Sequence, residues 1–163
     1  MQKIGFGGGC HWCTEAIFNA LNGVSRVEQG WICSSVVEGS TDSEAVIVHF
    51  NENKISLSRL IEVHLLTHSS TSRHSFRNKY RSAIYNFTHE QGKTAQDILI
   101  QKQKLFEKQI ITKVYIFKSF TLNQEKYLNY YQKNKDKPFC QTYIEPKLKL
   151  LLQKFSEEVK GSF

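Results

Sequence analysis

The sequence predicts an α/β fold of the α+β kind, with a mixed central sheet flanked by helices. Segments with strand alternation are interleaved with segments of helical period, but not in a strict strand–helix–strand repeat. Residues 43–51, "SEAVIVHFN", are largely apolar on both faces, which is typical of a strand in the middle of a sheet. The chain has 163 residues and no linker or internal repeat, so we expect one domain over residues 1–163.

The first half of the chain begins with a short apolar strand over residues 2–8 that ends in glycines. An apolar stripe predicts a helix over 10–23, with Gly23 as its C-terminal cap. Alternation predicts a strand over 24–39. After the central strand, helical spacing of leucines predicts a helix over 56–69 with Ser56 as its N-cap.

The second half follows the same alternation of element types. We expect, in order, a polar loop, a strand, a long helix, a strand, a short aromatic helix, a proline-containing loop and a C-terminal helix. The first six of these are predicted over residues 70–79, 80–87, 88–108, 110–120, 123–134 and 135–147.

Net charge, apolar runs and cysteine content limit the classes of function that we expect for this chain. The net charge is +7, but no nucleic-acid-binding motif accompanies it, and the lysines fall on stretches predicted as solvated helix faces. The sequence has no run of 18 apolar residues, so we expect no membrane span, and no signal peptide is recognisable, so we expect the protein in the cytoplasm. We also expect a monomer. In that compartment the four cysteines are expected to be thiols, ligands or catalysts rather than disulfides.

The segment "GGGCHWC", residues 7–13, carries the chemistry. Cys10 ends a strand and opens a helix, so its sulfur would lie near unpaired backbone N–H groups and the positive end of a helix dipole. Such surroundings lower a thiol pKa and produce a nucleophile. A small buried side chain behind a tight turn explains the local pattern equally well.

Two other site types fit the Cys-x-x-Cys spacing less well. A thioredoxin-like oxidoreductase would need a cis-proline facing the motif, and Pro138 and Pro146 lie too close to the C-terminus for that role. A zinc site would need a second ligand pair, and only His64 and His68 are compactly spaced. We therefore predict no metal.

Two residues are candidate partners of a nucleophile. Glu44 begins the central strand, where it is either a salt-bridging surface group, which the residue pattern favours, or a proton donor held in a pocket. Cys140 lies in the predicted proline-containing loop, where a mobile thiol could resolve an oxidised partner. Cys33 is expected to be an ordinary strand residue.

These residues together resemble the type A peptide methionine sulfoxide reductases. "FGGGCHWCTEAIF" is similar to the active-site segment of that family, and the resemblance continues through "GVSRVEQGW", "KYRSAIYNFTHEQ" and "KPFCQTYIEPKL". It covers nearly the whole chain. It implies a mixed sheet with a ferredoxin-like core, and an enzyme that reduces methionine-S-sulfoxide, free or in peptides, without a metal or organic cofactor.

The resemblance also implies roles for individual residues. Cys10 would attack the sulfoxide sulfur and become a sulfenic acid, while Glu44 gives a proton to the oxygen. Trp12 would pack on the S-methyl group. Cys140 would then form a disulfide with Cys10, which thioredoxin or a similar dithiol reduces. Cys13 is the alternative resolving thiol, which we expect to be held too rigidly one helical turn away.

The chain departs from the family pattern within the substrate site. His11 replaces a pocket Phe, Ser69 replaces an Asp, and the loop that usually carries an oxygen-binding Tyr is shortened to "GWICSS". Substrate-binding positions are therefore expected at His11, Trp12, Ser69 and Tyr80. These departures leave open a relative retuned to another small polar sulfoxide or oxidised thiol, and a non-catalytic relative.

Overall fold

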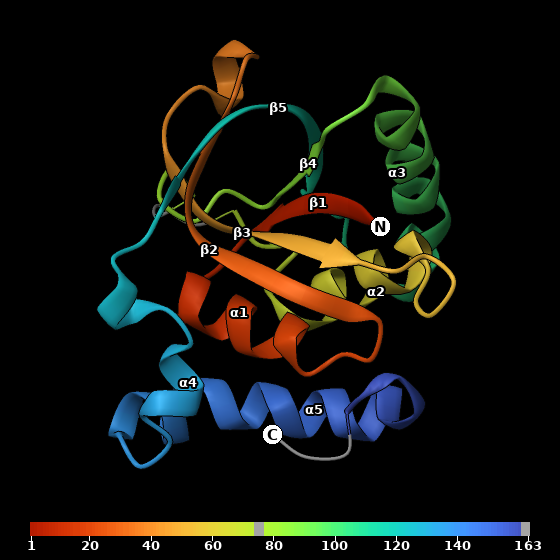
Figure 1. Ribbon diagram of the computed structural model, residues 1–163. Coiled ribbons are helices and arrows are strands. Elements are labelled where there is room, and N and C mark those ends of the chain that lie inside the picture. The colour runs from red at the N-terminus through yellow and green to blue at the C-terminus, as the bar shows by residue number, and fades with distance from the viewer. Residues whose placement is uncertain (74–76, 161–163) are drawn as a thin grey trace.

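The computed structural model describes residues 1–73 and 77–160, and it shows a sheet with helices packed outside it (Figure 1). The strands are β1 (Gln2–Gly7), β2 (Val24–Ser34), β3 (Ser43–Phe50), β4 (Ala83–Asn86) and β5 (Lys113–Leu122). The α-helices are α1 (His11–Asn19), α2 (Leu57–Thr67), α3 (His89–Lys102), α4 (Tyr130–Lys133) and α5 (Glu145–Phe155).

The sheet closes on itself in the order β1-β3-β2-β5-β4. Its first part has the neighbours β4-β1-β3-β2, all antiparallel, which is the split βαβ arrangement of a ferredoxin-like core. Strand β5 closes the barrel by pairing antiparallel with β2 and parallel with β4. The predicted mixed sheet flanked by helices is therefore confirmed, and the closure is what the sequence did not reveal.

Strand β3 lies between β1 and β2, as its two apolar faces predicted. Val46 and Val48 belong to the main core between the sheet and the helices. Ala45 and Ile47 belong to a second, smaller core inside the barrel. Both faces of this strand are buried because one faces the helices and the other faces the barrel interior.

Helix α1 is shorter than predicted. It ends at Asn19 with Ala20 as its C-cap, and Gly23 (φ 93°) instead forms the turn into β2. The predicted cap of α2 is confirmed, because the Ser56 side chain accepts a hydrogen bond from the backbone N–H of Arg59.

The predicted aromatic helix over 123–134 is broken. The structure has a 3₁₀ turn at Glu125–Tyr127 and then α4, separated by Asn129 in the left-handed region (φ 54°). The buried carboxylate of Glu15 accepts hydrogen bonds from the backbone N–H groups of Asn129 (2.9 Å) and Tyr130 (3.2 Å). These bonds from a distant helix favour a break over a continuous helix.

The predicted loop over 135–147 is wrong in its second half. Cys140–Ile144 forms a π-helical turn, η4, that leads directly into α5. Pro146 lies in the first turn of α5, where the missing N–H of proline costs no hydrogen bond. The buried face of α5, with Leu148 and Leu151, packs along α1, as Figure 1 shows at the base of the molecule.

The remaining differences are in element ends. Strand β2 stops at Ser34, β4 is limited to four residues, and α3 gives way to a 3₁₀ turn at Gln103–Leu105. Residues 74–76 of the predicted loop 70–79 lie outside the described residues. Among the helices of the described residues, none is long and apolar enough to cross a membrane.

Candidate active site

The glycine turn between β1 and α1 places Cys10 at the N-cap of α1. The Cys10 carbonyl accepts hydrogen bonds from the N–H groups of Cys13 and Thr14, both at 3.1 Å. Gly8 has φ +152°, and a Cβ there would collide with the imidazole of His68. The turn therefore depends on Gly8 for both its conformation and its space.

Buried polar groups hold this turn from beneath. His64 Nε2 donates to the carbonyl of Gly7 at 2.8 Å, and Arg77 Nη1 donates to the carbonyl of Gly8 at 2.9 Å. Burial lowers the pKa of His64 to about 3, so this imidazole is neutral at physiological pH. The donors to this turn are a neutral imidazole and a guanidinium that stays charged. Neither changes its protonation state near pH 7, so the hydrogen bonds that hold the turn do not depend on pH there.

The thiol of Cys10 is a thiolate at neutral pH. A hydrogen bond from the Cys13 side chain is the largest of the causes that bring the Cys10 pKa to about 4; His11 and the backbone N–H groups of Trp12 and Cys13 add to it. The same hydrogen bond, followed by burial, raises the pKa of Cys13. The pair shares one proton, with the charge on Cys10.

Glu44 lies at the start of β3, beside the N-terminus of α1. Its side chain is buried, with the residue 5% exposed, so the surface position that the sequence pattern favoured is wrong. The backbone N–H of His11 donates to Glu44 Oε1 at 3.3 Å, and the Lys79 ammonium lies 3.5 Å from Oε2. The residue is held there by pairing with Trp31 of β2 on one side and by the hydrogen bond from its backbone N–H to the carbonyl of Lys79, at 2.9 Å.

His11 lies between Glu44 on β3 and Asn123, which follows β5. Its Nδ1 lies 3.1 Å from Glu44 Oε1, a charge contact without hydrogen-bond alignment. Its Nε2 lies 3.4 Å from Asn123 Nδ2, which also donates to Gln29 Oε1 at 2.6 Å. Because the Asn123 amide donates at Nε2, we assign the ring proton to Nδ1, facing Glu44.

Cys10, His11 and Glu44 are also the described residues that could hold a metal ion. One ligand atom from each lies within 4.8 Å of the others. The spacing of cysteines and histidines in the sequence does not indicate these three ligands, because Glu44 comes from a distant strand. The Lys79 ammonium beside Glu44 opposes a cation there, and the chemistry below uses no metal.

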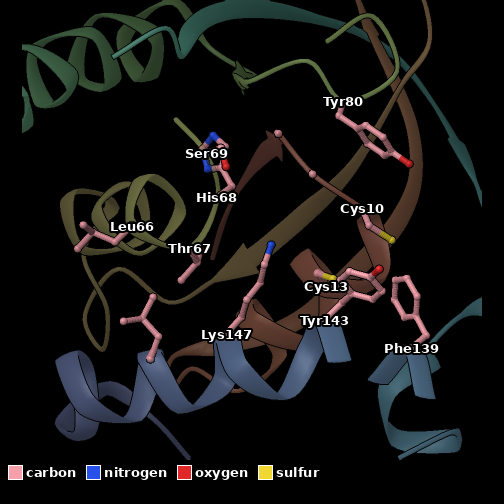
Figure 2. A pocket seen from close by; sticks show the side chains of 13 residues that line it. Cys10, Cys13, Leu66, Thr67, His68, Ser69, Tyr80, Phe139, Tyr143 and Lys147 are labelled. Atoms are coloured by element: carbon pink, nitrogen blue, oxygen red, sulfur yellow. The ribbon is translucent and has the colours of Figure 1, made fainter. Parts of the chain in front are cut away.

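Two cavities meet at the Cys10 sulfur. The first, of about 360 Å³, lies on the Glu44 side; its walls include His11, Trp12, Trp31, Glu44, Lys79 and Asn123. The second, of about 580 Å³, lies on the other side; its walls include Cys13, Leu66, Ser69, Tyr143, Lys147 and Leu150 (Figure 2). Cys10, Tyr80 and Phe139 line both cavities.

The predicted substrate-binding residues divide between these cavities. The Trp12 indole stacks on Tyr130, with ring centroids 3.9 Å apart, so one of its faces is already covered. Tyr80 stands between the cavities, with its hydroxyl on the Cys10 side in Figure 2. Ser69 is exposed and lines only the second cavity, so the structure does not bring it to Glu44.

Cys140 is not on a mobile loop. It begins the η4 turn and is 0% exposed, and it lines neither of the two cavities. Burial raises its pKa. Cys33 is a buried residue of β2 whose Sγ lies 2.9 Å from the hydroxyl oxygen of Ser119, as expected for an ordinary strand residue.

Comparison with known proteins decides the family. Residues 2–160 match the family model described as peptide methionine sulfoxide reductase. The chain is 35% identical over 173 residues to the peptide methionine sulfoxide reductase MsrA of Acinetobacter baumannii (strain SDF), covering 98% of this chain and 99% of that protein. For the MsrA of Trichodesmium erythraeum the identity is 33% over 176 residues, with 99% of each chain covered.

This chain belongs to the peptide methionine sulfoxide reductase family. The fold agrees. The reduced form of Mxr1 from Saccharomyces cerevisiae superposes with a TM-score of 0.74 at 23% identity, covering 87% of this chain and 90% of that one. Methionine sulfoxide reductase A of Corynebacterium diphtheriae gives a TM-score of 0.70 at 19% identity, covering 82% and 75%. The family is one of thiol-dependent oxidoreductases, and neither the retuned relative nor the thioredoxin-like enzyme is favoured.

Sequence reasoning missed several walls of this reductase site. Lys79, Trp31 and Asn123 line the first cavity, and Lys147 and Tyr143 line the second. Lys79 and Trp31 fall within segments that resemble the family, which is the only signal that could have singled them out. Tyr143 and Lys147 also fall within such a segment, residues 137–148, but their place beside Cys10 depends on how α5 packs on α1.

Proposed function

We propose that the chain reduces methionine-S-sulfoxide, free or in peptides, to methionine, with Cys10 as the nucleophile and Glu44 as the proton donor. The observation that carries this proposal is the cluster of a thiolate and a buried carboxyl group, which face one cavity from two elements. A charged nucleophile and a proton carrier within reach of one substrate atom are what sulfoxide reduction requires.

The first step balances on these two residues. The Cys10 thiolate gives an electron pair to the sulfoxide sulfur, and the proton on Glu44 passes to the sulfoxide oxygen. The oxygen then passes to Cys10: a bond forms between the Cys10 sulfur and the oxygen, the bond between the substrate sulfur and the oxygen breaks, and Cys10 is left as a sulfenic acid. The thioether leaves with the electron pair. The backbone N–H of His11 and the Lys79 ammonium both contact Glu44, so they hold its carboxylate after the proton has left.

The walls of the first cavity fit the rest of the substrate. Trp12, fixed by its stacking on Tyr130, would contact the S-methyl group with the part of its indole that lines the cavity. Tyr80 would donate to the oxygen or to the substrate backbone from the border of both cavities. His11 makes this cavity more polar than the usual Phe would, so we expect weaker binding of an apolar thioether.

The sulfenic acid is then resolved by a second thiol of the chain, and a dithiol protein reduces the resulting disulfide. One solved structure similar to this chain is Mxr1 in complex with Trx2, with a TM-score of 0.63 at 21% identity, covering 79% of this chain and 84% of that one. It supports a thioredoxin-type partner. The cysteines of the described residues are free, which fits a reducing compartment such as the cytosol, and we propose a single-domain monomer there.

The test is turnover with separated diastereomers of methionine sulfoxide in a blocked dipeptide, with dithiothreitol as reductant. We expect thioether from the S form only, and none from either form with Cys10→Ser. Cys33→Ser is the matched control, because Cys33 is buried in the barrel, and it should retain wild-type turnover. Absence of thioether from both forms, with the thiols reduced and the protein folded, would contradict the proposal.

A further inference from the structure

The second cavity has no part in the step proposed above, yet it contains a thiol and a cation beside the nucleophile. Figure 2 shows Lys147 extended from α5 into this space, with Cys13 and Cys10 on the neighbouring wall. We propose that Cys13, rather than Cys140, is the first thiol to resolve the Cys10 sulfenic acid, and that Lys147 assists it as a positioning residue. This rests on the proposed function.

The helix start brings the two sulfurs together. Cys10 is the N-cap and Cys13 is three residues on, the two positions whose side chains meet in a capping box. The hydrogen bond from the Cys13 N–H to the Cys10 carbonyl closes this turn at 3.1 Å. Residues so spaced on a helix have Cα atoms about 5 Å apart, within the range that a disulfide spans. The expectation that Cys13 is too rigid to close a bridge is therefore not supported.

The two cavities give the attack a direction. The oxygen of the sulfenic acid arises on the Glu44 side, because Glu44 protonates it there. Displacement at sulfur is in line, so the attacking thiol must come from the side opposite the oxygen. Cys13 lines the second cavity and Glu44 lines only the first, so we infer that the second cavity is the side from which Cys13 attacks.

The charges also set the order of events. Before the first step the Cys10 thiolate suppresses ionisation of Cys13, because its hydrogen bond with Cys13 is the largest cause that raises the pKa of Cys13, ahead of burial and of the Cys10 charge. Oxidation replaces that thiolate with a neutral sulfenic acid. The groups then facing Cys13 are Lys147 on α5, which lowers its pKa, and Cys140 on η4. Among residues 1–73 and 77–160, no ion pair neutralises Lys147.

Cys140 is in a weaker position for the first attack. It is fully buried at the start of a helical segment, and it lines neither cavity. The η4 turn, which packs against α1, holds Cys140 in this buried place. Its place in the relay is after Cys13, when exchange with the new disulfide would carry oxidation toward the C-terminal segment.

The step balances without another reactant. The Cys13 sulfur forms a bond to the Cys10 sulfur, the Cys10 S–O bond breaks, and the Cys13 proton completes the departing water. Cys10 is reduced from sulfenic acid to disulfide, and Cys13 is oxidised. The disulfide is later reduced by the thioredoxin-type partner of the proposed function.

The first experiment uses the wild-type chain. One equivalent of the S-sulfoxide is added without reductant, the reaction is quenched in acid at early times, and peptide mass spectrometry maps the disulfides. We expect one thioether per chain and a Cys10–Cys13 disulfide as the earliest species. A Cys10–Cys140 disulfide that appears first would overturn the inference.

Serine variants then separate the two thiols. In Cys13→Ser we expect a full burst of thioether, but a Cys10 sulfenic acid that persists at least about tenfold longer and is trapped by dimedone. In Cys140→Ser the Cys10–Cys13 disulfide should form at the wild-type rate. If Cys13→Ser resolves its sulfenic acid at the wild-type rate, the inference fails. A missing thioether burst in the wild type would instead contradict the proposed function.

Lys147 has a matched control on the same helix. Lys147→Met should slow Cys10–Cys13 disulfide formation about 5- to 10-fold at pH 7 and move its pH midpoint upward, and Lys147→Arg should restore both. Lys149→Met changes an exposed lysine of α5 that lines neither cavity, and it should have no effect. An unchanged pH midpoint in Lys147→Met would remove Lys147 from the proposal.

Discussion

The two cavities that meet at Cys10 differ in origin and in chemistry. The one on the Glu44 side is built mainly from the barrel and the start of α1, and it carries a carboxyl group, an ammonium group and an imidazole. The one on the other side is built with α5, and its walls are mostly apolar around one lysine and a second thiol. This difference is the basis of the two proposals above, in which the Glu44 side protonates the oxygen and the α5 side supplies the resolving thiol.

The strongest way to break this comparison is Glu44→Gln, which keeps the shape of the side chain but removes its proton. We expect the rate constant of thioether formation to fall about 10²- to 10³-fold, the size of effect seen when a group stabilising developing charge is lost. Disulfide formation after direct oxidation of Cys10 by hydrogen peroxide should stay within about twofold of wild type.

Rapid-quench measurement of both steps checks this prediction. Glu28→Gln is the control, because Glu28 is paired with His49 on the barrel surface, at 2.6 Å, and lines neither cavity. Equal losses in both steps for Glu44→Gln would show that the two sides are not separate.

The second prediction concerns the hydrogen bond from Cys13 to Cys10, which supports the thiolate from the thiol side. The Cys10 pKa of about 4 has this bond as its largest cause, so Cys13→Ala should raise it. A hydrogen bond to a charged group contributes about 1.5–3 kcal/mol, which moves the midpoint of thiolate formation up by about one to two pH units.

A higher Cys10 pKa lowers the fraction of thiolate at acidic pH. Cys10 in the alanine variant holds its proton to higher pH, so its alkylation by iodoacetamide should slow near pH 5 and match wild type near pH 8. The rate is read from the Cys10 peptide by mass spectrometry. Cys13→Ser keeps an O–H donor and should follow the wild-type profile. If the alanine profile also does so, His11 and the backbone N–H groups set the Cys10 pKa without the Cys13 side chain.

The smallest expected effect is on the oxygen side, with His11→Phe. An apolar ring would improve contact with an S-methyl group, and one buried methyl group contributes about 0.8 kcal/mol, so KM should fall about fourfold. The kcat should stay within about twofold, because Glu44 keeps Lys79 and the backbone N–H of residue 11.

Steady-state kinetics on the blocked dipeptide test this. His49→Phe, on the barrel surface, is the control and should change neither constant. A tenfold fall in kcat for His11→Phe would show that His11 takes part in proton transfer, and Glu44 would then not be the only group on its side of Cys10 that serves this step.

Much of the fold was predictable because its signals are local. The apolar faces of residues 43–51, the cap at Ser56 and the glycine turn before Cys10 each involve residues within a few positions of one another. The failures came where distant groups intervene. Asn129 breaks a helix because Glu15 accepts its N–H from 114 residues away, and Cys140 is helical because α5 packs on α1.

The sequence by itself therefore determined the position of the candidate nucleophile. A thiol at the N-cap of a helix, with Cys13 one turn later, is placed by backbone bonds that span only three or four residues. Only the tertiary structure decided what surrounds that thiol. Strand pairing buries Glu44 beside it, and α5 brings Lys147 to its other side, because closure of the barrel and packing of the last helix join residues that no local pattern relates.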